Sequence, residues 1–186
     1  MLLSEVSIES AEYLLDDIAR KHQLLLPNEL ASRFTIAELV NFYRIGLASK
    51  SWRMYVALND KHQVIGCIAI SISRLPILRS NLIRVLWGAR ENILYNLRFL
   101  LERTWHLYNL YPRRNIRKRI LFIFVSQDNQ RMGIGKALLF KISSENATDV
   151  YVDTKDENVA ALTMYQEANF VVAKRRFGQT LLVLKV

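Results

Sequence analysis

Cysteine, proline and glycine are all scarce in this chain, and each scarcity excludes a class of protein. The single cysteine, Cys67, cannot form an internal disulfide, which excludes a disulfide-stabilised scaffold. With 3 prolines and 6 glycines in 186 residues, the chain has no collagen-like, proline-rich or Gly/Ser-rich segment. Cys67 lies in the apolar run 64–70, so we expect a reduced and buried side chain.

Long hydrophobic runs are also missing. No apolar run approaches the roughly 20 residues that a membrane-spanning helix needs, and residues 1–6 lack the basic and apolar regions of a signal peptide. Together with the lone cysteine, these absences predict a soluble protein of the reducing cytoplasm. The length and the 51% share of hydrophobic residues predict a single domain over residues 1–186.

Positive charge is concentrated in one segment. The net charge of the chain is +9, and residues 74–119 alone hold eleven Lys or Arg against two Glu. Such a block favours anionic partners, namely phosphates, nucleic acid or an anionic membrane surface. Leucines and aromatic residues recur there at helical spacing with arginines between them, which predicts one or two amphipathic helices over about 74–111.

The hydrophobic pattern predicts a mixture of strands and helices. We expect strands at 5–9, 52–58, 64–73, 120–125, 150–154, 170–177 and 180–186. We expect helices at 11–22, at 28–47 with a break near 33–35, at 133–146, and from 156 or 157 to about 168. The run 120–125 is continuously apolar, which predicts a central strand buried on both faces. This order of elements indicates a single α/β domain.

The segment between the strand at 120–125 and the following helix has the features of an anion site. It reads Gln130-Arg131-Met132-Gly133-Ile134-Gly135-Lys136. The first turn of a helix leaves backbone N–H groups unpaired, and glycine lets the backbone approach a phosphate closely. A lone Gly-x-Gly also occurs at ordinary turns. The Walker and dinucleotide patterns are incomplete here, which argues against ATP and NAD.

A second motif lies further along the chain, where Asn158, Ala161 and Tyr165 fall on one face of the expected helix. The small Ala161 leaves room along that face, as an elongated ligand would require. A core tyrosine and a helix-capping asparagine would give the same pattern, so this motif alone leaves both interpretations open.

In this order and spacing, the two motifs resemble the GNAT superfamily of acyl-CoA-dependent N-acetyltransferases. Gln130, Gly133 and Gly135 match its phosphate motif, Gln/Arg-x-x-Gly-x-Gly/Ala. Its later signature is matched by Asn158, Ala161, Tyr165 and Phe170, but Asn169 stands where the family usually has glycine. Asparagine tolerates the left-handed conformation better than most residues, so it can substitute there. The resemblance implies an α/β fold with a mixed, mostly antiparallel central sheet flanked by helices, and a helical insertion before the central cofactor-binding strand.

The resemblance also implies a role for each matched residue. Tyr165 would be the general acid that protonates the departing CoA thiolate, and the Val125 backbone would polarise the acetyl carbonyl. Asp153, on the strand before the Tyr165 helix, is a candidate for the base that deprotonates the acceptor. The implied contacts to acetyl-CoA come from Phe124, Val125, Gln130, Arg131, Met132, Gly133, Ile134, Gly135, Lys136, Asn158 and Ala161. No metal is expected.

The implied reaction is direct transfer of an acetyl group from acetyl-CoA to a primary amine. The basic segment 74–119 suggests a small acceptor that carries phosphate, such as a nucleotide-linked amino sugar. The alternative is a GNAT-like scaffold with little or no catalysis that binds nucleic acid or an anionic membrane. Nucleic acid is the weaker of these two, because the aromatic residues of the segment occupy its apolar helix positions. The sequence leaves open the acceptor, the acyl chain length, and whether the protein is a monomer or a homodimer.

Overall fold

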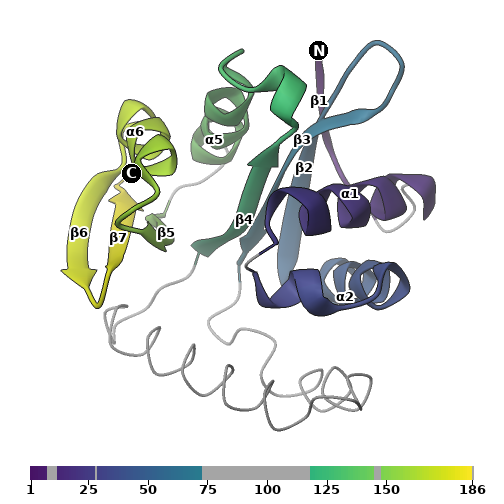
Figure 1. Cartoon of the computed structure of the whole chain (residues 1–186), viewed down its shortest axis with the longest axis horizontal. Coiled ribbons are helices and arrows are strands. Elements are labelled where there is room, and N and C mark those ends of the chain that lie inside the picture. Colours follow the sequence, from purple (N-terminus) through teal and green to yellow (C-terminus); the bar gives the residue numbers. More distant parts are fainter. Residues whose placement is uncertain (8–11, 28, 73–117, 145–147, 186) are drawn as a thin grey trace, which may run out of the picture.

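The structure is a computed structural model that describes residues 1–7, 12–27, 29–72, 118–144 and 148–185. Seven strands form one sheet in the order β1-β2-β3-β4-β5-β7-β6 (Figure 1). They are β1 Leu2–Glu5, β2 Trp52–Leu58, β3 Val64–Ser71, β4 Lys118–Val125, β5 Val150–Lys155, β6 Val171–Arg176 and β7 Gln179–Leu184. Among the described strands only β4 and β5 pair in parallel, so the predicted mixed, mostly antiparallel sheet is confirmed. Helices expected over 74–111 lie outside the described residues.

Helices cover both faces of the sheet (Figure 1). They are α1 Glu12–Leu25, the short η1 Leu30–Arg33, α2 Ile36–Ala48, the short η3 Gln127–Asn129, α5 Ile134–Ser144 and α6 Val159–Glu167. α1 and α2 enclose one core with residues of β2, β3 and β4, including Met54, Cys67 and Phe122. α5 and α6 enclose a second core with residues that include Ile68 and Val152. The sheet therefore separates two apolar layers.

The break predicted near residues 33–35 is confirmed, and its cause is a capping box at the start of α2. The Thr35 hydroxyl accepts a hydrogen bond from the Glu38 N–H at 3.3 Å, and the Glu38 carboxylate accepts one from the Thr35 N–H at 2.7 Å. These bonds satisfy backbone donors that a helix start leaves unpaired. Because the cap fixes the start of α2 at Ile36, the preceding chain forms the separate turn η1.

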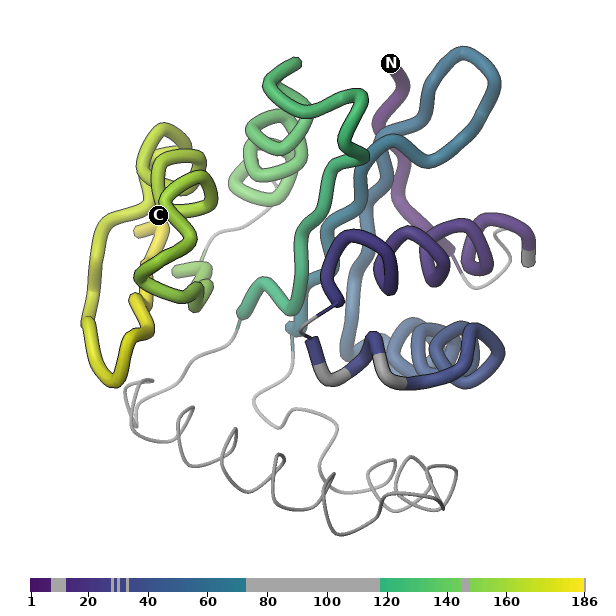
Figure 2. Tube along the Cα trace, in the orientation of Figure 1, coloured from purple at the N-terminus to yellow at the C-terminus, as the bar shows by residue number. Residues whose placement is uncertain are grey.

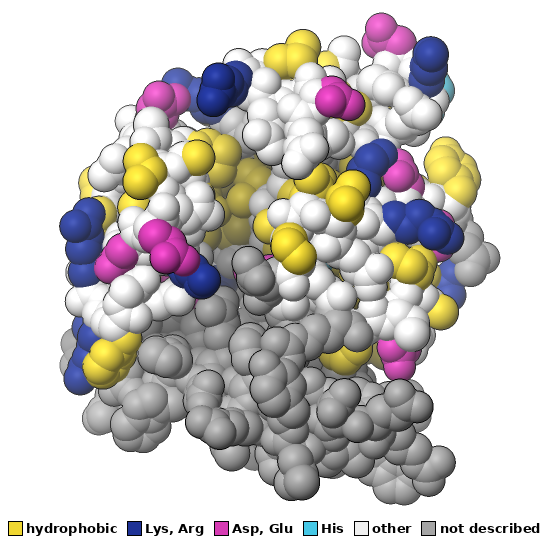
Figure 3. All heavy atoms as spheres, viewed as in Figure 1, with side chains coloured by type: hydrophobic (Ala, Val, Ile, Leu, Met, Phe, Trp, Pro, Cys, Tyr) yellow, Lys and Arg dark blue, Asp and Glu magenta, His cyan; other side chains and the backbone are white. Residues whose placement is uncertain are grey.

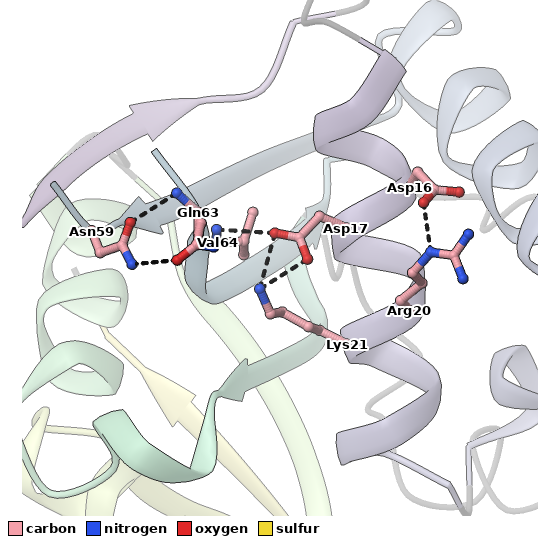
Figure 4. Close-up of polar contacts among 7 residues, drawn as sticks. All are labelled: Asp16, Asp17, Arg20, Lys21, Asn59, Gln63 and Val64. Atoms are coloured by element: carbon pink, nitrogen blue, oxygen red, sulfur yellow. Dashed lines mark hydrogen bonds and ion pairs between the residues drawn. The ribbon is translucent and has the colours of Figure 1, made fainter. Parts of the chain in front are cut away.

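One carboxylate ties α1 to the sheet (Figure 4). Asp17 accepts a hydrogen bond from the Val64 N–H at 3.1 Å, where β3 begins, and pairs with Lys21 at 2.9 Å. The same view shows Asn59 and Gln63 bonded across the turn between β2 and β3. α1 also contacts α2 and β4, and the Cα trace shows α1 and α2 lying next to each other (Figure 2). Asp17 therefore joins this pair of helices to the start of β3.

The first strand lies earlier than the pattern predicted. We expected residues 5–9, but β1 is Leu2–Glu5, paired from Leu2 opposite Leu58 to Glu5 opposite Tyr55. Val6 is buried and donates its N–H to the Met54 carbonyl at 2.8 Å, just beyond the strand. Its burial explains the apolar signal that suggested a later strand. The limits of this edge strand are set by pairing with β2, which local alternation does not reveal.

Candidate active site

The two parallel strands at the centre of the sheet diverge. β4 and β5 pair only at Lys118 with Val150 and at Arg119 with Tyr151. Beyond these pairs the described strands separate, and the gap between them opens towards α5 and α6 (Figure 1). In the space-filling view a hollow lined by hydrophobic side chains lies in the same place (Figure 3). A parallel pair that opens in this way exposes one backbone edge of β4.

The burial of β4 follows from this gap and differs from the prediction. Ile120, Phe122 and Phe124 are buried, whereas Leu121, Ile123 and Val125 are only partly buried. The expectation of a strand buried on both faces was therefore wrong. Ile123 and Val125 pack against the core beneath α5 and α6, on the face next to the gap. A partner strand that turns away leaves that face less covered.

The backbone of Val125 is directed into the gap. The next residue, Ser126, donates its N–H to the Ile65 carbonyl at 2.9 Å, on the β3 side. Because backbone groups alternate in direction along an extended chain, the N–H and carbonyl of Val125 point away from β3. The Gln130 side-chain amide reaches the Val125 carbonyl from that side, at 3.4 Å. Phe124, by contrast, places its ring in the core beneath α1 and α2.

The predicted anion site forms a tight turn before α5. Arg131 and Gly133 have φ values of 61° and 78°, and α5 begins at Ile134. Gln130, Arg131, Met132, Gly133 and Lys136 are exposed, whereas Ile134 and Gly135 are buried. Apart from its two neighbours in the chain, no described residue comes within 4 Å of the position that a Cβ on Gly133 would take, which leaves room for an anion there. Exposed N–H groups, two basic side chains and a helix start provide the chemistry of an anion site.

Gly135 has a different function from Gly133. A Cβ at Gly135 would lie 2.5 Å from the Met164 sulfur and 3.7 Å from a Val125 methyl group. The glycine therefore lets α5 approach α6 closely at the inner end of the gap. Lys136, one residue further, has its ammonium 3.9 Å from the Glu167 carboxylate of α6. The close approach at Gly135 packs the two helices together, whereas the Lys136–Glu167 pair is exposed at the surface.

The residues of the second motif lie at or next to α6, where Asn158 is exposed and Tyr165 is buried. Asn158 caps the helix, because its side-chain oxygen accepts the Ala161 N–H at 3.2 Å. Its side chain is nevertheless exposed, so its amide nitrogen remains accessible from solvent. Tyr165 is buried against Phe170, with ring centroids 5.6 Å apart. Asn169 has a φ of 66°, the left-handed conformation in which asparagine replaces glycine.

The surroundings of Tyr165 keep its hydroxyl protonated. Burial raises the pKa of Tyr165 well above its usual value, and the carboxylates of Asp153 and Glu29 raise it further. A phenol in such a place is in its acid form throughout the neutral range, as a proton donor requires. Sequence reasoning missed Glu29, because no motif marks it and it lies far from Tyr165 along the chain.

The candidate base Asp153 is held in an ion pair. Its carboxylate oxygen lies 2.8 Å from an Arg119 nitrogen, and only 4% of its side chain is exposed. Arg119 forms the last pair of β4 with β5, so this ion pair joins the two strands where the gap begins. The arrangement explains how the strands are held together at the closed end of the gap.

A second group of polar side chains is buried beneath α1 and α2. The Nδ1 atom of His22 lies 2.7 Å from the Tyr43 hydroxyl, and its ring contacts Phe122 with centroids 4.5 Å apart. Burial lowers the pKa of His22 to about 4, so the ring is neutral at physiological pH. Cys67 is fully buried, as expected, and burial raises its pKa. These groups belong to the packing of the core.

Comparison with known proteins agrees with this geometry. The model of the acetyltransferase (GNAT) family matches residues 18–170. The chain belongs to the GNAT family of acetyltransferases. Its predicted class, an acyl-CoA-dependent N-acetyltransferase with acetyl-CoA as acyl donor, is confirmed at the level of this family. No curated protein matches its sequence significantly.

Solved structures with the same fold cover nearly the whole GNAT chain. Arabidopsis thaliana NAA60 in complex with acetyl-CoA has a TM-score of 0.61 and 13% identity, covering 100% of this chain and 98% of its own. A mutant of the spermidine N-acetyltransferase SpeG from Vibrio cholerae has a TM-score of 0.62 and 13% identity. The match covers 100% of this chain and 95% of the SpeG chain. The aminoglycoside 6'-N-acetyltransferase AAC(6')-Ih from Acinetobacter baumannii has a TM-score of 0.61 and 17% identity, and the match covers 95% of each chain. At these identities, the likeness shows the fold.

The described residues show neither a metal-binding cluster nor a membrane-spanning helix. They contain no group of three or more His, Cys, Asp or Glu side chains that could hold a metal ion. Within the same residues, no helix is both long and apolar enough to cross a membrane.

Proposed function

We propose that this GNAT protein transfers an acetyl group from acetyl-CoA to a primary amine by direct attack of the amine. The divergence of β4 from β5 beside the start of α5 carries the proposal. In this proposal the exposed edge of β4, the turn before α5 and the buried Tyr165 would together form one site at the gap.

The turn before α5 fits the pyrophosphate of the donor. Gly133 presents open space where a side chain would stand, and Arg131 and Lys136 supply positive charge. The backbone N–H groups of 131–136 would bind the phosphate oxygens, as at other helix starts. The exposed amide of Asn158 and the small Ala161 lie on α6, across the gap, where they would contact the pantetheine arm.

The chemistry at the inner end of the gap would use two groups of this chain. The Val125 N–H, directed into the gap, would donate to the carbonyl oxygen of the acetyl group and stabilise the charge that develops there. Tyr165 would supply the proton that the leaving thiolate needs, since a thiol of that kind has a pKa of roughly 8.5. In this proposal the protein would supply both groups, and the thioester would supply the reactive acyl group.

The acceptor stays a proposal. The named substrates of the structural neighbours, spermidine and aminoglycosides, define the first amines to test. A phosphate-bearing amine, such as a nucleotide-linked amino sugar, belongs in the same panel because of the basic segment 74–119. That segment lies almost wholly outside the described residues, so its support comes from charge alone.

The test is an acetylation assay with the full-length protein. Acetyl-CoA is incubated with spermidine, an aminoglycoside, a peptide with a free N terminus and a nucleotide-linked amino sugar. Both free thiol and acetylated product are measured. We expect thiol release that depends on one of these amines and equals the product formed. Thiol release without acetylated amine would indicate hydrolysis, and no release with any amine would contradict the proposal.

A further inference from the structure

Met132 is the most exposed of the four methionines, and it lies in the turn before α5. It is 68% exposed, whereas Met54 is fully buried and Met164 is partly buried. Met1 is also exposed, at 61%, but it lies next to the edge strand β1. Met132 is therefore the one methionine within the segment whose backbone N–H groups would bind the donor pyrophosphate.

The cysteine of the chain is protected from oxidants. Cys67 is fully buried in the core beneath α1 and α2, and burial raises the pKa of its thiol. Because the thiolate is the form that reacts with a peroxide, this side chain is inert at neutral pH. A thioether has no proton to lose, so its oxidation depends on access to the sulfur. A peroxide in solution therefore reaches Met132 far more readily than Cys67.

The Met132 sulfur lies beside a hydrogen-bond donor. The Asn129 side-chain amide donates to it, with nitrogen and sulfur 3.9 Å apart. Asn129 is itself anchored, because its backbone N–H donates to the Ser126 carbonyl at 2.9 Å, directly after β4. Arg131 and Gly133, on either side of Met132, have positive φ values of 61° and 78°. The thioether thus belongs to a tight turn at the end of β4, next to the start of α5 (Figure 1).

We propose that Met132 is an oxidation site at which a peroxide lowers the affinity of the protein for acetyl-CoA. The inference rests on the proposed function, because it requires the donor pyrophosphate at the turn 130–136. A lone pair of the thioether sulfur attacks one oxygen of hydrogen peroxide, and the O–O bond breaks as the S–O bond forms. The leaving hydroxide takes the proton of the transferred oxygen and becomes water. The sulfur is oxidised by two electrons to the sulfoxide, and the peroxide is reduced.

The sulfoxide opposes anion binding in two ways. Its oxygen is a strong hydrogen-bond acceptor, whereas a thioether sulfur is a weak one. The oxygen therefore competes with phosphate for the Asn129 amide and for the backbone N–H groups of the turn. Its partial negative charge also lies near the helix start, where it repels a second anion. Neither effect requires the protein to unfold.

The experiment compares the wild-type full-length protein with Met132→Leu and with Met164→Leu, the same change at the methionine that packs against Gly135. Each protein is treated with hydrogen peroxide, and peptide mass spectrometry locates the added oxygen. Calorimetry gives the acetyl-CoA Kd before and after treatment. We expect Met132 to be oxidised well before Met54. Treatment should raise the Kd of the wild type and of Met164→Leu by about tenfold, and should leave the Kd of Met132→Leu as it was before treatment.

Two further measurements use the same samples. Saturating acetyl-CoA should slow the oxidation of Met132 and leave that of Met1 unchanged, because Met132 alone lies at the turn. Methionine sulfoxide reductases for both epimers should restore the wild-type Kd. The Tm of the oxidised protein should stay close to that of the untreated protein, which separates a local effect from unfolding.

Several results would contradict the inference. An unchanged Kd in wild-type protein whose Met132 has been oxidised would overturn it, and so would an equal rise in Met132→Leu. Oxidation of buried Met54 at the same rate as Met132, with a lowered Tm, would attribute the effect to unfolding. If the untreated protein binds no acetyl-CoA, the proposed function fails and this inference fails with it. Binding that oxidation of Met132 leaves unchanged removes this inference alone.

Discussion

Among single residues, the chemistry depends most on Tyr165. The ring is fixed against Phe170, so Tyr165→Phe removes the hydroxyl and keeps the packing. We expect kcat to fall by about 100-fold or more, because proton donation is lost. The acetyl-CoA Kd from calorimetry and the Tm should stay close to the wild-type values. Wild-type turnover in a variant that binds the donor normally would remove Tyr165 from the mechanism.

A second single residue, His22, makes the stability of the protein depend on pH. In the unfolded chain a histidine has a pKa of roughly 6.5, whereas burial lowers the folded value to about 4. Between these values the unfolded state binds more protons, so stability falls as pH falls from about 6.5. The loss between about pH 7 and about pH 5 should be about 2 kcal/mol. Urea unfolding at both pH values measures it.

The control for this prediction is His22→Gln, which removes the titrating ring. Carboxylates also contribute to the loss of stability in acid. The test is therefore the difference between the two proteins in the free energy of unfolding lost on acidification. The variant should be less stable at neutral pH, because the bond to the Tyr43 hydroxyl is disturbed, but it should lose less stability on acidification. Equal losses in both proteins would show that His22 does not titrate as described.

At the scale of elements, two glycines in open turns form a matched pair. Gly133 before α5 and Gly178 in the β6–β7 turn have φ values of 78° and 71°, and a Cβ at either would meet nothing within 4 Å. Alanine at such a φ costs about 1 kcal/mol. We therefore expect Gly133→Ala and Gly178→Ala to lower stability similarly. Only Gly133→Ala should weaken acetyl-CoA binding, by tenfold or more, which calorimetry would detect. An equal Kd in both variants would place the pyrophosphate elsewhere.

Elements with strong local signals were predictable from the sequence, and those set by distant partners were not. The break predicted before α2 has a local cause, because Thr35 and Glu38 form a cap within four residues of each other. The apolar run 120–125 predicted a strand correctly, but its burial on both faces was wrong because β5 diverges after two pairs. The sequence of β4 does not indicate the residue at which β5 stops pairing with it. β1 was misplaced for a similar reason, since its limits depend on β2.

For the whole molecule, the sequence indicated the donor side better than the acceptor side. The turn before α5 and the helix α6 lie close together in the chain, and their residues form recognisable motifs. The gap between β4 and β5 depends instead on the point at which two strands distant in sequence stop pairing, and no local motif reveals that point. The candidate site is therefore only partly evident from the sequence.

The proposed reaction requires one acetyl-CoA molecule bound at the turn 130–136. Calorimetric titration of the full-length protein with acetyl-CoA, with ATP and NAD as controls, tests this most directly. We predict saturable binding of acetyl-CoA with one site per chain and no comparable binding of NAD or ATP. Absence of acetyl-CoA binding, or equal binding of all three nucleotides, would contradict the assignment of the turn at 130–136 and with it the proposed reaction.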